Sequence, residues 1–379
     1  MPDTVQDQEV TPLELFFDLV FVFAITQVSS FVSDDATWTH LLEGVAILAV
    51  LWWAWVSYAW LGNTAGSDDG AVRVVLLSAM GAMLIVSVAV PGAFTDHGLI
   101  FGVAYLAVRL LHLGAYALLA RADPSLRGVV ARLASTAVPG AALLVLGGAL
   151  HGTPRAICWV AALVVDYGGL AVRGVEGWRV QPSHFAERHG LIIIIALGES
   201  IVSLGLGASG LDLDARVVTG ALLGVAISAA LWWAYFDVVA IVAERRLRDA
   251  PYERQIRIAR DSYTYLHLPM VAGIVLFAFA MEVTVEHVGR TLDTIPAFAL
   301  CAGPALYLLA FVLLRLRIAG RLGRGRLVTA AACMALFPVA LAVPALAALA
   351  LVASVWVAFH VYELIWWHDA RAETRALRE

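Results

Sequence analysis

The chain has 379 residues, of which 61% are hydrophobic and only 15% are charged, against about 25% charged residues in soluble domains. Apolar runs of about 20 residues recur along the sequence, and each is long enough to cross a hydrocarbon core about 30 Å thick. This pattern excludes a soluble globular domain. The net charge of −5 says little, because charge is sorted by loop. No basic, aromatic-rich platform appears, so we expect the lipid bilayer and no nucleic acid as a partner.

The apolar runs predict an all-α, polytopic transmembrane helical bundle of about twelve spans. In chain order the predicted spans cover residues 13–33, 41–61, 72–91, 98–120, 129–150, 155–172, 185–207, 216–240, 263–283, 293–314, 326–345 and 347–366. The last two are separated by almost no loop. The three cysteines all fall inside predicted spans without a CxxC pair, so no disulfide framework is expected.

Arginines gather in alternate loops, after predicted spans 4, 6, 8, 10 and 12. The opposite loops hold only Arg155 and Arg290, with Arg216 at a span boundary. Because cytoplasmic loops of membrane proteins are enriched in Lys and Arg, this bias predicts that both termini are cytoplasmic. An even number of spans also puts both termini on the same side of the membrane.

Two similar segments suggest an internal repeat. The second predicted span contains LWWAWVS from Leu51, and the eighth contains LWWAYFD from Leu231. Each follows a span with a glutamate near its cytoplasmic end, Glu14 and Glu187 respectively. We predict two six-helix halves in parallel orientation, residues 1–180 and 181–379, a repeat that some transporters use. The alternative is chance, because Trp-rich helix ends are common at membrane interfaces.

Acidic side chains occur at two predicted helix starts. Asp18 lies one turn deeper in the membrane than Glu14 and on the same helix face. The positive end of the helix accounts for Glu14 and poorly for a second acid one turn further in. The seventh predicted span opens with HFAERHG at residues 184–190. It places Glu199 about 18 Å deeper than Glu187.

Opposite charges elsewhere suggest partners for these acids. Glu187 is expected to pair with Arg188 or with arginines of the preceding loop. Glu199 is expected to pair with Arg109 of the fourth span, one turn from His112. The alternative for Glu199 is a protonated side chain that hydrogen-bonds to a neighbouring helix.

Charged side chains inside a bilayer usually face a bundle interior or a water-filled cavity, because exposure to lipid is costly. We predict a polar cavity open to the cytoplasm and closed below by a Glu199–Arg109 pair, although a structural role is simpler for any single histidine. Asp166 is a further acid expected in the cytoplasmic half of the bundle. The candidate residues of this intramembrane site are Glu14, Asp18, Arg109, His184, Glu187, His189, Glu199, Asp237 and His267.

We predict no cofactor for this site. His, Asp and Glu side chains suit a divalent metal such as Zn²⁺, Mn²⁺ or Fe²⁺, which stays as the lesser alternative. His184 and His189 are five residues apart and point in different directions on a continuous helix. The sequence also contains no phosphate-binding loop of the Walker type and no dinucleotide fingerprint.

Five segments carry a resemblance to a known family. They are TPLELFFDLVFVFAITQVS at 11–29, LWWAWVSYAW at 51–60, HFAERHGLIIIIALGESIVSLG at 184–205, LWWAYFD at 231–237 and YTYLHLPMVAGI at 263–274. Over essentially its whole length, the chain resembles the bacterial low temperature requirement protein A (LtrA) family. The resemblance implies a multi-pass protein of the bacterial cytoplasmic (inner) membrane. It assigns no catalytic role to any residue.

Three classes of function fit these features. The first is a proton- or ion-coupled transporter for a small molecule or ion, with a cavity open to the cytoplasm. The second is a membrane-embedded enzyme that acts on a lipid or isoprenoid through Glu, Asp and His acid–base or metal chemistry. The third is a non-catalytic envelope or signalling protein. The sequence leaves the substrate and the oligomeric state open.

Overall fold

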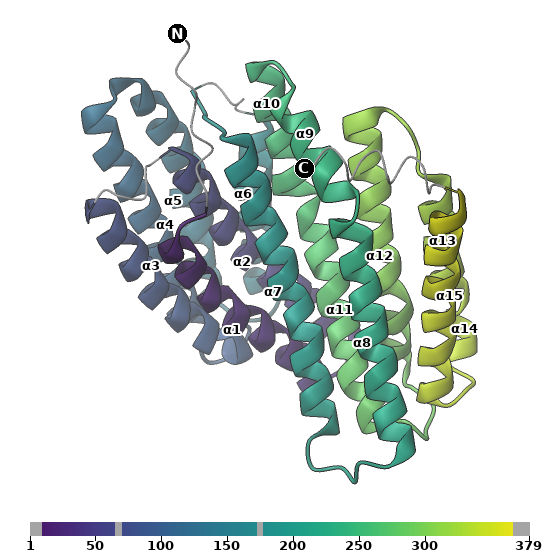
Figure 1. Cartoon of the computed structure of the whole chain (residues 1–379). Coiled ribbons are helices and arrows are strands. Elements are labelled where there is room, and N and C mark those ends of the chain that lie inside the picture. Colours follow the sequence, from purple (N-terminus) through teal and green to yellow (C-terminus); the bar gives the residue numbers. More distant parts are fainter. Residues whose placement is uncertain (1–9, 65–69, 173–176, 367–379) are drawn as a thin grey trace. The chain divides into compact units, whose positions relative to one another are not determined.

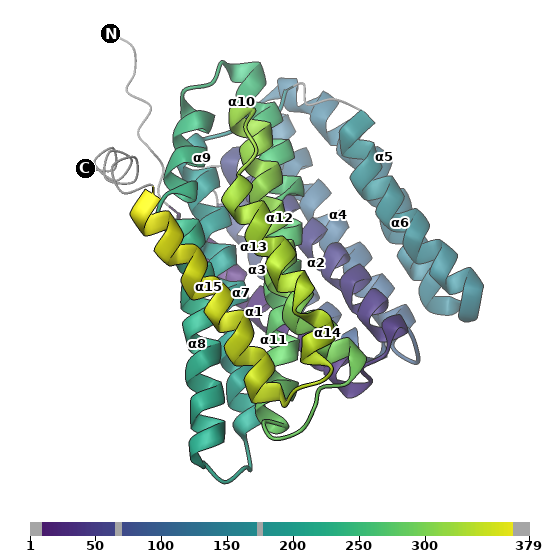
Figure 2. The ribbon, with the colours of Figure 1, turned by 90° about the vertical axis from the view of Figure 1, so that its right-hand side faces the viewer.

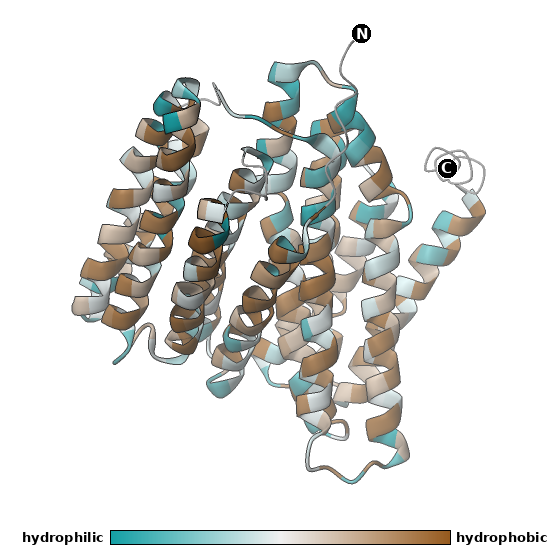
Figure 3. Ribbon diagram, turned by 60° about the vertical axis from the view of Figure 1, so that its left-hand side comes forward, coloured by the Kyte–Doolittle hydropathy of each residue, from teal (hydrophilic) through white to brown (hydrophobic). Residues whose placement is uncertain are grey.

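The computed structural model describes residues 10–64, 70–172 and 177–366, and this part of the chain is almost entirely helical with no β-strand. Eleven of its helical segments are long and apolar enough to cross a membrane. Apolar residues cover the bodies of the helices, and polar residues lie mostly near their ends (Figure 3). The predicted all-α polytopic fold is therefore confirmed.

The chain divides into two compact units. The first contains the residues up to Phe31 and Leu42–Arg188, and the second contains Val32–Leu41 and the residues from His189 onwards. Three helices, α1, α2 and α7, contribute residues to both units. The predicted structural relation between residues 1–180 and 181–379 stays a prediction.

In the first unit, consecutive helices α3 to α6 pack side by side (Figure 1). A glycine allows α4 and α5 to approach closely, since a Cβ atom at Gly102 would lie 2.7 Å from Cα of Val145. The helices with residues in this unit are α1 (Pro12–Asp34), α2 (Trp38–Thr64), α3 (Gly70–Val88), η1 (Val90–Gly92), α4 (Gly98–Ala122), η2 (Pro124–Leu126), α5 (Arg127–Ala149), α6 (Gly152–Val172) and α7 (Pro182–Ala208).

In the second unit, the central pair is α11 and α12, whose backbones meet at Gly273 and Gly303. Helix α15 packs against α8 and α13 (Figure 2). The remaining helices of this unit are α8 (Ala215–Phe236), α9 (Val239–Arg248), α10 (Tyr252–Ile258), the π-helix η3 (Ala259–Tyr265), α11 (His267–Glu286), α12 (Thr294–Ala319), α13 (Arg324–Ala335), α14 (Phe337–Ala340) and α15 (Ala345–Trp366).

Two regions differ from the predicted spans. The span predicted at 326–345 is split into α13 and α14, and Pro338 lies in the first turn of α14. Proline lacks the N–H that a continuous helix needs and clashes with the preceding turn, which explains why eleven rather than twelve single helices meet the length for a span. The segment between residues 240 and 263, which was predicted as a loop, is also helical and contains α9, α10 and η3.

Candidate functional site

A buried cluster of charged side chains joins α1 to the start of α7 in the first unit. Nη1 of Arg188 lies 2.8 Å from Oε1 of Glu14, and Nη2 lies 2.7 Å from Oδ1 of Asp18. His184 approaches the other Glu14 oxygen at 3.1 Å, and the indole N–H of Trp55 donates to Asp18 at 2.9 Å. All four charged or titratable side chains are buried. We call these five residues the Arg188 cluster.

The spacing of residues along two helices builds this cluster. Glu14 and Asp18 are four residues apart on α1, and His184 and Arg188 are four apart on α7, so each pair occupies one helix face. Glu14 also forms a capping box with Thr11, whose backbone N–H donates to Oε2 of Glu14 at 3.0 Å, an arrangement that fixes a helix start. The cap and the ion pairs together orient the Glu14 carboxylate.

A glycine in α2 makes room for the carboxylate. A Cβ atom at Gly62 would overlap Oε1 of Glu14 and lie 3.5 Å from Cε1 of His184. Any larger residue at this position would displace the groups that meet there. Gly62 is therefore part of the site, although the sequence pattern alone did not single it out.

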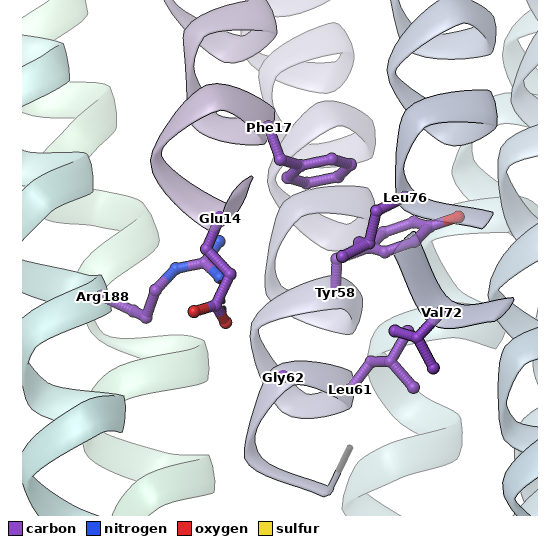
Figure 4. Close-up of a pocket in the computed structure, with 8 residues that line it drawn as sticks. All are labelled: Glu14, Phe17, Tyr58, Leu61, Gly62, Val72, Leu76 and Arg188. Carbon is purple, nitrogen blue, oxygen red and sulfur yellow. Dashed lines mark hydrogen bonds and ion pairs between the residues drawn. The ribbon is translucent and has the colours of Figure 1, made fainter. Parts of the chain in front are cut away.

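The cluster borders a small pocket, shown in Figure 4. Glu14 and Arg188 point toward each other on one side, and Phe17, Tyr58 and Leu61 contribute apolar walls. The pocket has a volume of about 10 Å³, which is room for roughly one water molecule. Three polar atoms in the cluster have no hydrogen-bond partner within the described part of the chain, namely Asp18 Oδ2, His184 Nδ1 and Arg188 Nε.

The charges of the cluster do not cancel by themselves. Two carboxylates face one guanidinium, so one positive charge or one proton is needed for neutrality. His184 supplies that charge when its imidazole is protonated, as does a proton on either carboxyl group. Because an unpaired charge in a buried site costs several kcal/mol, neutralisation of this excess negative charge would be favoured.

Arg188 has other partners than the sequence suggested. The predicted pairing with Glu187 is wrong, because neighbouring residues on a helix point about 100° apart. Glu187 instead accepts a hydrogen bond from the backbone N–H of Val10 at 3.2 Å. Arg188 was missed as a site residue, and its four-residue spacing from His184 was the signal that could have identified it.

A second ion pair lies deeper in the first unit, between Arg109 of α4 and Asp166 of α6 at 3.3 Å. Arg109 also donates to Oγ of Ser57 at 2.8 Å, and His112 contacts the Ser57 carbonyl at 3.0 Å. Both charged side chains are buried. The expected Glu199–Arg109 pair is therefore replaced by an Asp166–Arg109 pair, because the depth of a residue does not determine which helix faces it.

Histidines and tyrosines form a group in the second unit. The imidazole of His267 lies 2.9 Å from the Tyr235 hydroxyl through Nε2 and 2.9 Å from the Ser262 carbonyl through Nδ1. A carbonyl only accepts, so Nδ1 carries the proton and Nε2 of the neutral ring accepts from Tyr235. His189 and Tyr263 pack against His267, with ring centres 5.1 Å and 5.0 Å away.

This group sits at the π-helix η3, which ends two residues before His267. A π-helix changes the register of the side chains that follow it and is common at functional sites. The helical period alone does not predict this register. The pairing of Tyr235 with His267 could not be read from the sequence for that reason.

Two further residues of the predicted intramembrane site, Glu199 and Asp237, also lie in the second unit. Glu199 is buried in α7 and accepts a hydrogen bond from Ser203, one turn further along, at 3.1 Å. Asp237 is half-buried at the end of α8, where its backbone N–H bonds to the carbonyl of Trp233. Neither belongs to the groups around Arg188 or His267.

The arrangement of the acids does not match a metal centre. Within residues 10–64, 70–172 and 177–366, no three His, Cys, Asp or Glu side chains are placed to hold a metal ion. In the Arg188 cluster the guanidinium lies between Glu14 and Asp18, where a bound cation would otherwise sit.

Comparison with known proteins places the chain in a family. The family model of bacterial low temperature requirement A protein (LtrA) matches residues 9–361. A protein of Rhizobium meliloti (strain 1021), Uncharacterized protein RA0937, is 32% identical over 309 residues, which cover 78% of this chain and 74% of that protein. No solved structure matches. The chain therefore belongs to the bacterial low temperature requirement A (LtrA) family of multi-pass membrane proteins.

Proposed function

We propose that this protein is a proton-coupled transporter of the bacterial cytoplasmic membrane, with both termini in the cytoplasm and the Arg188 cluster as its proton site. The observation that carries the proposal is the charge count of the cluster, in which Glu14 and Asp18 face the single guanidinium of Arg188. The distribution of arginines supports a cytoplasmic position for this end of α1 and α7. The polar groups at this end form the cytoplasmic entrance of the transport pathway.

The cluster provides coupling because its stability depends on one proton. While the proton is bound, the buried charges balance, and Glu14 and Asp18 stay with Arg188. When the proton leaves, the excess negative charge favours either hydration of the site or entry of another cation. Loss of the proton would therefore move or hydrate these side chains and open the pocket. In this way a proton gradient would drive the opening of the pocket.

The second candidate is an enzyme that acts on a lipid or isoprenoid. It is favoured by His184, which contacts Glu14 at 3.1 Å and is placed to exchange a proton with it as an acid–base pair. Such an enzyme would convert a substrate without moving any solute across the membrane. Transport and catalysis are therefore separable by experiment.

The test uses purified protein in liposomes loaded with neutral buffer. A soluble extract of bacteria grown on a ¹³C carbon source is added outside, with or without an inward proton gradient, and trapped solutes are identified by mass spectrometry. We expect at least one solute to accumulate only with protein and a gradient. Equal solute content in protein-free liposomes would contradict transport. Conversion of added lipids without any accumulation would establish the enzyme instead.

A further inference from the structure

A cleft rich in arginine lies in the second unit and contains no residue of the Arg188 cluster. It is formed by the helical hairpin of α9 and α10 and by the end of α12, and the hairpin is visible in Figure 1. Its volume is about 450 Å³, within the range of roughly 300–1,000 Å³ that is usual for small-ligand sites. The lining residues are Val242, Arg245, Arg246, Asp249, Ala250, Pro251, Arg254, Ile258 and Ile318.

The charges that line the cleft are unbalanced. Three arginines face one acid, and Arg245 already pairs with Asp249 at 3.5 Å. Arg246 and Arg254 form no ion pair with the residues that the structure describes, and both are exposed. Two guanidinium groups are therefore available to an anionic ligand.

Nearby acids do not supply the missing charge. Glu244 and Glu253 each pair with an arginine four residues further along their own helix, Arg248 and Arg257 respectively. Asp261 is held by Arg260 and Arg317, both at 2.7 Å. The acids on α9, α10 and η3 thus form their ion pairs with arginines other than Arg246 and Arg254, which stay open to an external anion.

The apolar part of the lining indicates the kind of anion. Val242, Ile258 and Ile318 lie beside the arginines in the same cleft. Tyr252 at the hairpin is exposed, and exposed tyrosines are enriched at the level of lipid headgroups. A free phosphate needs only the charged groups, whereas a phospholipid presents a phosphate and an acyl chain together. Basic pockets between membrane helices on the cytoplasmic side commonly bind anionic headgroups.

We infer that the cleft between α9, α10 and α12 binds an anionic phospholipid, with Arg246 and Arg254 on the phosphate and the exposed Val242 against the upper acyl chain, above the buried Ile258 and Ile318 of the lining. Guanidinium groups suit this role because they contact phosphate oxygens in pairs. The inference is independent of the transport proposal, because none of these residues belongs to the Arg188 cluster.

The test measures binding of fluorescently labelled phosphatidylglycerol to the full-length protein in micelles of a neutral detergent, by anisotropy. The variant R246Q/R254Q is compared with the control R127Q/R321Q, which removes two exposed arginines outside the cleft. Each arginine near a membrane surface contributes about 1 kcal/mol to binding of anionic lipid. We therefore expect affinity to fall about thirtyfold in the cleft variant and to stay unchanged in the control.

Three further arms decide the outcome. R246K/R254K, which keeps both charges, is expected to retain most of the binding, and labelled phosphatidylcholine is expected to bind weakly to every variant. Equal losses in the cleft variant and the control would overturn the inference in favour of a general charge effect. Full competition by millimolar inorganic phosphate, with no dependence on the acyl chain, would overturn it in favour of a free-anion site. Unchanged thermal unfolding without lipid shows that each variant is folded.

Discussion

Replacement of Arg188 by glutamine tests whether the buried charges depend on one another. The guanidinium lies 2.8 Å from Glu14 and 2.7 Å from Asp18, and two unit charges about 4 Å apart attract by about 4 kcal/mol at an effective dielectric constant of about 20. Removing one partner of a buried ion pair costs about 3–5 kcal/mol, because the other charge stays buried and unpaired. We expect Arg188→Gln to lower the free energy of unfolding by that amount.

A double-mutant cycle with Asp18→Asn sharpens this prediction. The asparagine side chain keeps an oxygen for the Trp55 N–H and removes one of the two acids that Arg188 neutralises. In the Arg188→Gln background the second change removes an unpaired charge, so the combined loss should be smaller than the sum by roughly 1–3 kcal/mol. The assay is unfolding by a denaturing detergent in mixed micelles, followed by circular dichroism.

The control for this cycle is Arg127→Gln, at the exposed start of α5. A surface substitution of this kind usually changes stability by less than about 0.5 kcal/mol. The reasoning is refuted if Arg188→Gln is as stable as the control. It is also refuted if the two changes in the cluster add to within about 0.5 kcal/mol, since the charges would then act independently.

Two further substitutions test local geometry. Gly62→Ala places a methyl group against Oε1 of Glu14, so we expect it to abolish proton-driven uptake in liposomes. The control Gly81→Ala has open space around the added atom and should leave uptake intact. Equal uptake by both variants would contradict the assignment of Gly62 to the site. Tyr235→Phe removes the hydroxyl that donates to His267 and leaves a buried acceptor unsatisfied. We therefore expect the free energy of unfolding to fall by about 1–3 kcal/mol. An unchanged unfolding midpoint would argue against this hydrogen bond.

The fold was predictable because its signals are local. Apolar runs of sufficient length identify helices in a membrane, and the four-residue spacing of Glu14 and Asp18 correctly put both acids on one helix face. The split near Pro338 was missed, because the span at 326–345 was predicted as one helix despite the proline within it. The helical hairpin at 239–258 was missed because charged, amphipathic segments were treated as loop.

The partners within the site were harder to predict, because they depend on which helices are neighbours. Arg109 and Asp166 are 57 positions apart and on different helices, and the depth of Arg109 fitted Glu199 equally well. In the same way, the sequence allowed an ion pair between Arg188 and Glu187, because it does not show that α1 packs against Arg188. Hydropathy reports depth in the membrane, whereas an ion pair also requires lateral position and helix rotation.

The central claim is that the Arg188 cluster exchanges the proton that drives transport. Liposomes containing the protein and a trapped pH dye are placed in an inward proton gradient together with the accumulated solute. We expect solute-dependent internal acidification for the wild type and for the control Glu286→Gln, at an exposed helix end, and none for Glu14→Gln. Solute uptake by Glu14→Gln with the same acidification as the wild type would contradict the account.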